Sequence, residues 1–251
     1  MSMPRKIRCI VEAITDHGGR VYTLDLKPEG LVPSFRPGQF LHLTVDAYDP
    51  SGFWPESRVF SIASSPRNRK HLRLCYSVKG RYTTRMEQVL APGREVWVKL
   101  PYGDFVIDDS SDAILVAGGT GISAFTAFIE ALTPATTQKV TLVYGARTPA
   151  LFLFSEMLLA QLAAVPGFRG VFFTETADVM FAQQMAAHPK VPTCLTGRIS
   201  VAALLQGLTS DLCCPSSVFY LSGPPVMLKT LGGDLQSRGV LAENIRTDAW
   251  E

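Results

Sequence analysis

One short segment of the sequence combines a guanidinium, an aromatic ring and a hydroxyl: Arg58-Val59-Phe60-Ser61. If this segment is a strand, Arg58 and Phe60 point to the same side, because alternate residues of a strand share a face. A guanidinium is a planar fork that suits phosphate oxygens, and an aromatic ring offers a stacking surface. The segment is therefore a candidate site for a phosphorylated ring compound. The alternative is a surface arginine beside a core phenylalanine.

Two further segments are rich in glycine or hydroxyls where a helix is expected to begin. They are Gly80-Arg81-Tyr82-Thr83-Thr84 and, after an apolar run, Gly118-Gly119-Thr120-Gly121-Ile122. Backbone N–H groups at such helix starts bind phosphate. The second segment is not the G-x-G-x-x-G fingerprint, and Phe125 breaks the G-x-S-x-G pattern of a hydrolase. Anion sites in both halves suggest two dinucleotides, or one that spans the halves. Glycines that only permit close packing are the alternative.

The first hundred residues must position the arginine segment, and they read as short strands bounded by turn residues. The predicted strands are Lys6–Thr15, Val21–Leu26, Phe40–Val45, Arg58–Ala63, Leu72–Val78 and Glu95–Leu100. One helix, Arg85–Leu90, is predicted among them, with Thr83-Thr84 as its N-cap. Many short strands at this spacing predict a sandwich or a small barrel.

The second half alternates strands with helices. The predicted strands are Ala113–Ala117, Val140–Tyr144, Val171–Thr174 and Val218–Leu221. The predicted helices are Ser123–Leu132, Leu151–Ala164, Val201–Leu208 and Pro225–Arg238. This order predicts a doubly wound α/β domain with a parallel sheet. With the boundary between Asp104 and Asp112, the two domains are residues 1–106 and 107–251.

Composition narrows the class of protein. The chain has 251 residues, of which 47% are hydrophobic and 18% charged, as expected for a folded protein. No uninterrupted apolar run is long enough for a membrane span, and no signal-peptide core follows the basic start, so we expect a cytoplasmic protein. The five cysteines are scattered and have none of the spacings that hold zinc or an iron–sulfur cluster. We expect free thiols and no metal.

The net charge is +2, but the charged residues are distributed unevenly along the sequence. The stretch from Arg58 to Arg85 holds eight cations and no acid, which leaves the remainder at −6. Its cations are Arg58, Arg67, Arg69, Lys70, Arg73, Lys79, Arg81 and Arg85. Such a cluster suits phosphates, an acidic protein or nucleic acid, and the alternative is a solvated face.

Several motifs together resemble the ferredoxin-NADP reductase superfamily, and the resemblance runs from about Pro37 to Trp250. In the first half they are Arg58-x-Phe60-Ser61, Ile62-Ala63-Ser64-Ser65-Pro66, Gly80-x-x-Thr83 and the junction Pro101-Tyr102-Gly103-Asp104-Phe105. In the second half they are Gly118-Gly119-Thr120-Gly121-Ile122, Tyr144-Gly145-Ala146-Arg147 and Ser222-Gly223-Pro224-Pro225-Val226-Met227. The resemblance implies a flavin-binding antiparallel β-barrel followed by an NAD(P)-binding α/β domain, without an iron–sulfur domain.

For the barrel, the resemblance implies that Arg58 pairs with the flavin diphosphate and that Phe60 lies against the isoalloxazine or ribityl region. Ser61 would sit near flavin N5. The other implied flavin-binding residues are Ile62, Tyr76, Ser77, Val78, Gly80, Tyr82, Thr83 and Thr84. The family usually has Tyr in place of Phe60, so a phenol hydrogen bond to the flavin is missing here.

For the α/β domain, the resemblance implies that Thr120 and Gly121 contact the nicotinamide dinucleotide and that Arg147 lies on its adenosine side. Ser222 would stand at the nicotinamide end, where the family often has Cys. The other implied cofactor-binding residues are Glu175, Gly223, Pro224 and Met227. Trp250 would cover the flavin face until nicotinamide displaces it; the alternative is a docked tail. Ser61, Ser222 and Trp250 are the expected catalytic residues.

The choice of nicotinamide depends on Glu175, which stands where the family places a pair that holds the 2′-phosphate. A carboxylate repels that phosphate and accepts hydrogen bonds from a free ribose. We therefore favour NADH over NADPH. Arg147, Arg169 and Arg198 are cations that could reverse this preference.

The predicted function is that of a FAD-dependent NAD(P)H oxidoreductase that passes electrons to an external carrier such as ferredoxin or flavodoxin. The basic stretch would suit an acidic carrier. One alternative is a flavin or ferric reductase that uses small acceptors. Another is a flavin-binding electron-transfer subunit without turnover of its own. Nucleic acid is not expected as a partner, because the basic stretch has few aromatics and a flavin diphosphate explains its arginines better.

Overall fold

The structure is a computed structural model that describes residues 3–177, 181, 183, 194–203 and 217–248. The chain divides into two compact units. The first is Met1–Val106 with Ser123–Phe128, and the second is Ile107–Ile122 with Ile129–Glu251. None of the helices in the described ranges is long and apolar enough to cross a membrane.

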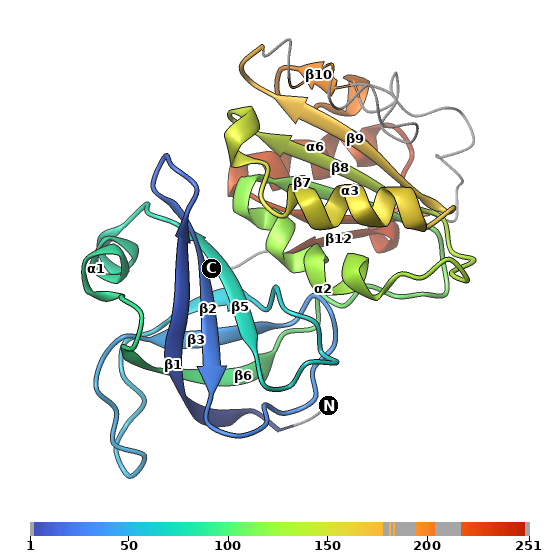
Figure 1. Cartoon of the computed structure of the whole chain (residues 1–251). Coiled ribbons are helices and arrows are strands. Elements are labelled where there is room, and N and C mark those ends of the chain that lie inside the picture. Colours follow the sequence, from blue (N-terminus) through green and yellow to red (C-terminus); the bar gives the residue numbers. More distant parts are fainter. Residues whose placement is uncertain (1–2, 178–180, 182, 184–193, 204–216, 249–251) are drawn as a thin grey trace. The chain divides into compact units, whose positions relative to one another are not determined.

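The first unit contains one six-stranded antiparallel sheet (Figure 1). Its strands are β1 (Arg5–Asp16), β2 (Val21–Pro28), β3 (Phe40–Thr44), β4 (Arg58–Ser61), β5 (Leu72–Ser77) and β6 (Glu95–Tyr102). They follow the order β4-β3-β6-β1-β2-β5. The chain just after β4 bonds to β5, since the N–H of Ala63 donates to the carbonyl of Arg73 at 2.8 Å. The sheet is therefore a nearly closed barrel, and the predicted antiparallel β-barrel is confirmed.

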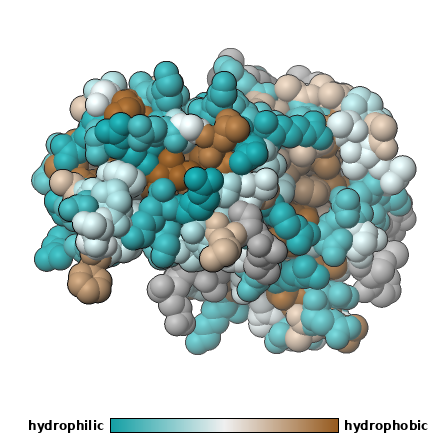
Figure 2. All heavy atoms as spheres, turned by 90° about the horizontal axis from the view of Figure 1, so that it is seen from below, coloured by the Kyte–Doolittle hydropathy of each residue, from teal (hydrophilic) through white to brown (hydrophobic). Residues whose placement is uncertain are grey.

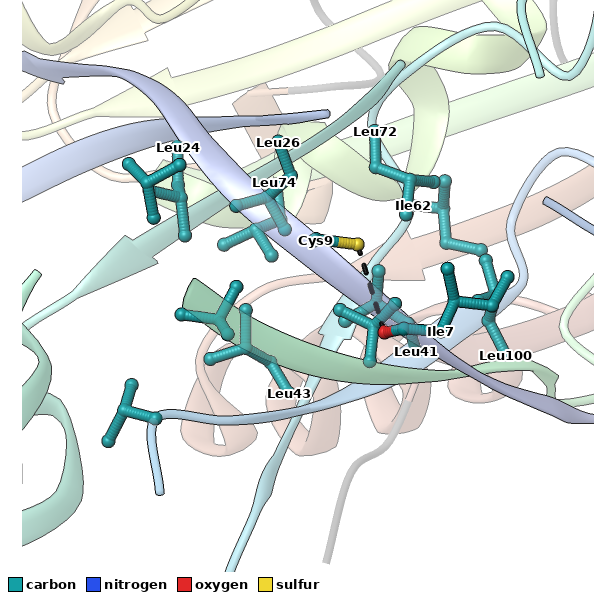
Figure 3. Packing of buried hydrophobic residues seen from close by; sticks show 14 of the residues in the cluster. Ile7, Cys9, Leu24, Leu26, Leu41, Leu43, Ile62, Leu72, Leu74 and Leu100 are labelled. Carbon is teal, nitrogen blue, oxygen red and sulfur yellow. Dashed lines mark hydrogen bonds between the residues drawn. The ribbon is translucent and has the colours of Figure 1, made fainter. Parts of the chain in front are cut away.

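The barrel core is built from the alternate residues that point inward. In β1, Ile7, Cys9 and Val11 are buried while the intervening side chains are exposed. Figure 3 shows the leucines of β2, β3 and β5 around Cys9. Each fully buried side chain of this size contributes about 1.5–3 kcal/mol of hydrophobic stabilisation. This core holds the short strand β4 and its arginine in place.

The helix of the first unit begins earlier than the sequence predicts. α1 spans Arg81–Val89, and its N-cap is Gly80 rather than the predicted Thr83-Thr84. The Thr83 hydroxyl instead accepts from the N–H of Gly80 at 3.2 Å. A threonine at the third helical position thus caps the helix from inside its first turn, which explains why the helix begins four residues earlier than predicted.

The second unit contains one six-stranded parallel sheet in the order β10-β9-β8-β7-β11-β12. Its strands are β7 (Ala113–Gly118), β8 (Val140–Ala146), β9 (Phe168–Thr174), β10 (Cys194–Thr196), β11 (Val218–Ser222) and β12 (Ile245–Asp248). The helices that follow strands are α2 (Ser123–Ala131), α3 (Ser155–Ala164) and α6 (Pro225–Ser237). Residues Ser123–Phe128 of α2 are grouped with the first unit. Figure 1 shows α3 on one face of the sheet and α6 on the other, so the predicted doubly wound α/β fold is confirmed.

Three predictions of elements in this unit need correction or completion. The predicted helix Leu151–Ala164 is a short 3₁₀ turn at Pro149–Leu151 followed by α3, because Phe154 takes a left-handed conformation at φ 61° and interrupts the helix. Strands β10 and β12 were not predicted, since three and four residues are too few for a periodic pattern. Of the predicted helix Val201–Leu208, residues 201–203 are helical and the rest lies outside the described residues.

The surface is mixed in polarity. Figure 2 shows hydrophilic side chains over most of one face, with hydrophobic atoms in separate patches. Among the residues that the structure describes, the exposed large hydrophobic side chains are Met3, Ile10, Leu31, Phe53, Val226 and Leu241.

Candidate functional site

Arg58 lies on β4, and the register of β4 against β3 fixes where its side chain points. Arg58 is opposite Leu43, and Phe60 is opposite Leu41. Both leucines are buried in the barrel core. Directly opposed residues of antiparallel strands share a face. Arg58 and Phe60 therefore lie on the same side of the sheet, as their spacing predicts.

The guanidinium of Arg58 is held on three sides. Its Cζ lies 4.8 Å from the centroid of the Tyr82 ring. Nη1 donates to the backbone carbonyl of Ser57 at 2.8 Å, and Nη2 pairs with Oε1 of Glu56 at 3.0 Å. A cation over an aromatic face is stabilised by about 0.5–1 kcal/mol at exposed sites. Together these contacts fix the plane of a guanidinium that remains half-exposed.

The Tyr82 ring, against which the Arg58 guanidinium lies, is held in place by hydrogen bonds of its hydroxyl. Its hydroxyl accepts from the N–H of Val45 at 3.2 Å and lies within donating distance of the carbonyls of Leu43 and Glu56, at 3.1 and 3.2 Å. Burial raises the pKa of the Tyr82 phenol, so the phenol keeps its proton and remains a donor. Tyr82 thus ties the first turn of α1 to β3 and to the segment before β4.

The start of α1 presents backbone donors next to Arg58. The first hydrogen bond inside the helix runs from the N–H of Thr84 to the carbonyl of Gly80 at 2.9 Å. The N–H groups of Arg81, Tyr82 and Thr83 therefore have no acceptor within the helix. The Thr83 hydroxyl already bonds to Lys79 and Gly80. For an anion at this end, the backbone donors of the first turn are the available groups.

An aromatic wall continues from Phe60. The Phe60 ring meets the edge of Tyr76 at a centroid distance of 6.4 Å, and Tyr76 stacks on Tyr22 at 5.2 Å. Tyr76 is buried, whereas Phe60 is only half-buried and offers an open surface. Ser77 and Val78, at the end of β5, are also half-buried. A flat apolar ring fits such a surface.

The residues that follow Phe60 differ in which of their groups could contact a ligand. Ser61 ends β4 and is buried, and the Ile62 side chain is fully buried in the barrel core. Ile62 can therefore meet a ligand only through its backbone. The hydroxyl of Ser64 is buried and has no hydrogen-bond partner in the described part of the chain. A buried hydroxyl of this kind costs stability unless a ligand or water satisfies it.

The basic stretch is less cationic than its sequence indicates. Four of its eight cations pair with three carboxylates, all of which lie outside the stretch: Glu56 pairs with Arg58 and Arg81, Asp25 with Arg73, and Asp46 with Arg85. Arg67, Lys70 and Lys79 are exposed. The charge available to a partner is thus concentrated at a few positions rather than spread over the stretch.

In the second unit, glycines bring the ends of β7 and β11 into close contact. A Cβ on Gly121 would lie 2.3 Å from the backbone oxygen of Ser222. A Cβ on Gly118 would lie 2.6 Å from Sδ of Met227, and one on Gly223 would meet the Met227 methyl at the same distance. The glycines therefore have a packing role. Because glycine has no side chain, the backbone at these positions is not covered by one.

Ser222 and Asp248 form a buried polar pair at the carboxyl edge of the sheet. Ser222 Oγ donates to Asp248 Oδ2 at 2.8 Å. Ser222 is opposite Ala117 in the sheet register, directly beside the glycine turn that begins at Gly118. Ligands of doubly wound folds bind at this edge. Asp248 was not predicted as a site residue, because its strand β12 is too short to recognise from the sequence.

Arg147, Glu175 and Arg198 follow the carboxyl ends of β8, β9 and β10. Glu175 and Arg198 form an ion pair at 3.3 Å, and all three side chains are exposed. Arg169 lies near the start of β9, at the opposite edge of the parallel sheet, so it does not join them. Trp250 lies outside the described residues.

Comparisons with known proteins agree with this fold. Residues 115–232 match the model of the oxidoreductase NAD-binding domain family. The terephthalate 1,2-dioxygenase reductase component 1 of Comamonas sp. is 31% identical over 89% of this chain and 61% of its own length. The flavohemoprotein of Deinococcus radiodurans is 27% identical over 88% of this chain and 53% of its own. The chain thus spans a little over half the length of these relatives.

A solved structure covers both units. The flavohem-like FAD/NAD-binding domain of a nitric oxide dioxygenase from Vibrio cholerae superposes with a TM-score of 0.75 at 19% identity, over 97% of this chain and 98% of that one. This likeness shows that the chain has a two-domain fold, an antiparallel barrel followed by a parallel α/β sheet. It is the fold that the resemblance to the ferredoxin-NADP reductase superfamily implies.

Proposed function

We propose that this chain is a FAD-dependent NAD(P)H oxidoreductase that passes electrons from a nicotinamide through FAD to an external carrier. The observation that carries this proposal is the fixed guanidinium of Arg58, which lies on Tyr82 beside the open N–H groups of α1. Residues 1–106 would bind the flavin and residues 107–251 the nicotinamide nucleotide. The compact units support these two domains but group Ser123–Phe128 with the first.

The donor set of the barrel fits FAD. Arg58 and the backbone N–H groups of the first turn of α1 would hold the diphosphate, since both donate to phosphate oxygens. Phe60 would face the flavin ring or ribityl chain, beside the end of β5. The buried hydroxyl of Ser64 would gain a partner. Ser61 would lie near the reacting edge of the ring.

The carboxyl edge of the parallel sheet fits a nicotinamide nucleotide. The backbone at Thr120 and Gly121 would admit the diphosphate, and Arg147 would lie on the adenosine side. Ser222 would contact the nicotinamide through its hydroxyl, whose orientation is fixed by the bond to Asp248. Gly223, Pro224 and Met227 would form the wall of this end. We assign Asp248 to the positioning of Ser222.

The reaction chemistry would be supplied by the two cofactors, a hydride by the nicotinamide and single-electron release by FAD. The residues of the chain would bind and orient them. Arg58 would offset charge on the diphosphate, Phe60 would supply an apolar surface, and Met227, which packs against Gly118 and Gly223, would help to exclude water at the nicotinamide end. Ser222 holds its proton toward Asp248, which leaves the Ser222 oxygen free to accept a hydrogen bond from the ligand.

NADH is the proposed donor. Glu175 stands at the end of β9, where its carboxylate would repel a 2′-phosphate and accept from ribose hydroxyls. Arg198 is already paired with this carboxylate. Arg169, at the opposite sheet edge, cannot offset the charge.

The proposed acceptor is a separate ferredoxin or flavodoxin, or an oxygenase that such a carrier serves. Reductase components of a terephthalate dioxygenase and of a propane 2-monooxygenase are among the relatives, and this supports an oxygenase system. An acidic carrier would meet the exposed Arg67, Lys70 and Lys79. We place this reaction in the cytoplasm.

A reconstitution experiment tests the proposal. Purified protein is incubated with excess FAD, passed through a desalting column and examined by visible absorbance, and NADH oxidation is then followed with ferredoxin, flavodoxin or ferricyanide as acceptor. The proposal predicts retained flavin and acceptor-dependent NADH oxidation. Protein that binds no flavin from excess FAD would overturn it. NADH oxidation with ferricyanide but with neither ferredoxin nor flavodoxin would favour a flavin or ferric reductase.

A further inference from the structure

Glu56 occupies the position that an anion would take between two arginines. Its Oε1 pairs with Nη2 of Arg58 at 3.0 Å, and its Oε2 lies 3.5 Å from Nη2 of Arg81. Glu56 precedes β4, whereas Arg81 is the first residue of α1. One carboxylate thus bridges the two elements that carry the anion-binding groups of the barrel.

The main chain of Glu56 is fixed at the same place. Tyr82 lies within donating distance of the Glu56 carbonyl, 3.2 Å away, while the Tyr82 ring lies under Arg58. The backbone of residue 56 and the guanidinium of Arg58 are therefore fixed by one buried side chain. The Glu56 side chain itself remains 40% exposed, so it can turn into solvent without breaking these contacts.

A flavin diphosphate on Arg58 would meet this carboxylate. Two like charges about 4 Å apart in water repel strongly enough to change a binding constant about fivefold, and more where water is partly excluded. The repulsion is relieved only if Glu56 leaves Arg58 when the ligand arrives. Glu56 offsets one of the two arginine charges before binding, and the diphosphate would take over this role afterwards.

We propose that Glu56 is an internal competitor for the flavin diphosphate: its carboxylate holds Arg58 and Arg81 in place in the flavin-free chain and weakens flavin binding. The inference rests on the proposed function and deepens it, because it assigns to one residue the control of how readily the protein gains and loses flavin. Glu56 is a residue that sets affinity rather than a catalytic residue.

The test is a set of binding titrations on the Glu56→Gln variant, which removes the charge and keeps the shape. Dissociation constants are measured by fluorescence for FAD and for riboflavin, which has the ring but no phosphate. Inorganic pyrophosphate is titrated against the flavin-free protein as a probe of the anion site alone. Glu29→Gln is the matched control, since Glu29 also pairs with an arginine, Arg8, and Arg8 lies on β1.

At low salt, the affinity of Glu56→Gln for FAD and for pyrophosphate is expected to be at least about fivefold higher than that of the wild type. Added salt should reduce this gain, and the affinity for riboflavin should not change. Glu29→Gln is expected to match the wild type. If the wild type binds FAD but Glu56→Gln binds it equally or more weakly, the inference is wrong. A wild type that binds no FAD at all would refute the proposed function instead. Thermal melting of Glu56→Gln and of Glu56→Asp, which keeps the charge, separates a folding defect from a binding effect.

Discussion

Ser222 donates a hydrogen bond to Asp248 across two neighbouring parallel strands, and both side chains are buried at the carboxyl edge of the sheet. The bond joins the end of β11 to the end of β12, an edge strand of only four residues. It therefore anchors the last described strand of the chain and at the same time orients a hydroxyl beside the glycine turn.

Replacing Ser222 with alanine should lower the free energy of unfolding by about 1.5–3 kcal/mol, because the buried carboxylate of Asp248 loses a hydrogen-bond donor. Urea denaturation followed by circular dichroism measures the change. Ser237→Ala is the control: its hydroxyl bonds to the Asp234 carbonyl at the exposed end of α6, and the change should stay within about 0.5 kcal/mol. Equal stabilities of Ser222→Ala and wild type would show that the pair does not anchor β12.

Gly121→Ala should destabilise the second unit strongly, because the new Cβ would lie 2.3 Å from the backbone oxygen of Ser222. We expect a loss of about 2 kcal/mol or more. Gly233→Ala is the matched control: Gly233 lies inside α6 with open space around it, and alanine there should stabilise by about 0.5–1 kcal/mol. Thermal melts of both variants give the comparison. Tolerance of alanine at Gly121 would refute the close approach of residue 121 to the end of β11.

The sequence predicts the parts of this molecule that depend on local patterns. The shared face of Arg58 and Phe60 is predicted without a structure, because it follows from the two-residue repeat of a strand. The strand Lys6–Thr15 is likewise predicted from its residues and the turn residues that follow it.

The parts that the sequence does not predict depend on partners brought together by folding. Asp25 and Asp46 neutralise Arg73 and Arg85 from 48 and 39 residues away, so a count of charge along the basic stretch overestimates what the surface offers. Glu56 lies only two residues before Arg58, just outside that stretch, so its pairing with Arg58 could have been expected from the sequence. Asp248 was hidden because its strand is too short to show a period.

Glu175→Ser should shift nucleotide preference toward NADPH. Removal of the carboxylate ends its repulsion of a 2′-phosphate and frees Arg198 to pair with that phosphate. The ratio of kcat/KM for NADPH to that for NADH should rise about five- to tenfold. Steady-state kinetics with ferricyanide as acceptor measure it. Glu156→Ser, on the first turn of α3, removes an equal charge and should leave the ratio unchanged. An unchanged ratio in Glu175→Ser would place nucleotide selection elsewhere.

Asp25 should make the barrel sensitive to acid. Burial alone would raise the pKa of Asp25, but hydrogen bonds from His71 at 2.8 Å and Arg73 at 2.7 Å outweigh it and hold the pKa below its usual value. A lowered pKa in the folded state adds stability above the pKa of the unfolded chain, about 4, and this stability is lost as the pH falls through the folded value. Urea midpoints should therefore decline below about pH 4, and the decline should be smaller in Asp25→Asn. An identical decline in both proteins would exclude Asp25 as the source.

The proposed function requires this one chain to hold FAD where a nicotinamide can reduce it. Anaerobic mixing of the FAD-loaded protein with NADH in a stopped-flow spectrophotometer, without any acceptor, measures this step alone. We expect complete bleaching of the oxidised flavin band in one fast phase with NADH and slower bleaching with NADPH. Flavin that stays bound and oxidised in excess of both nucleotides would show that the proposed function is wrong.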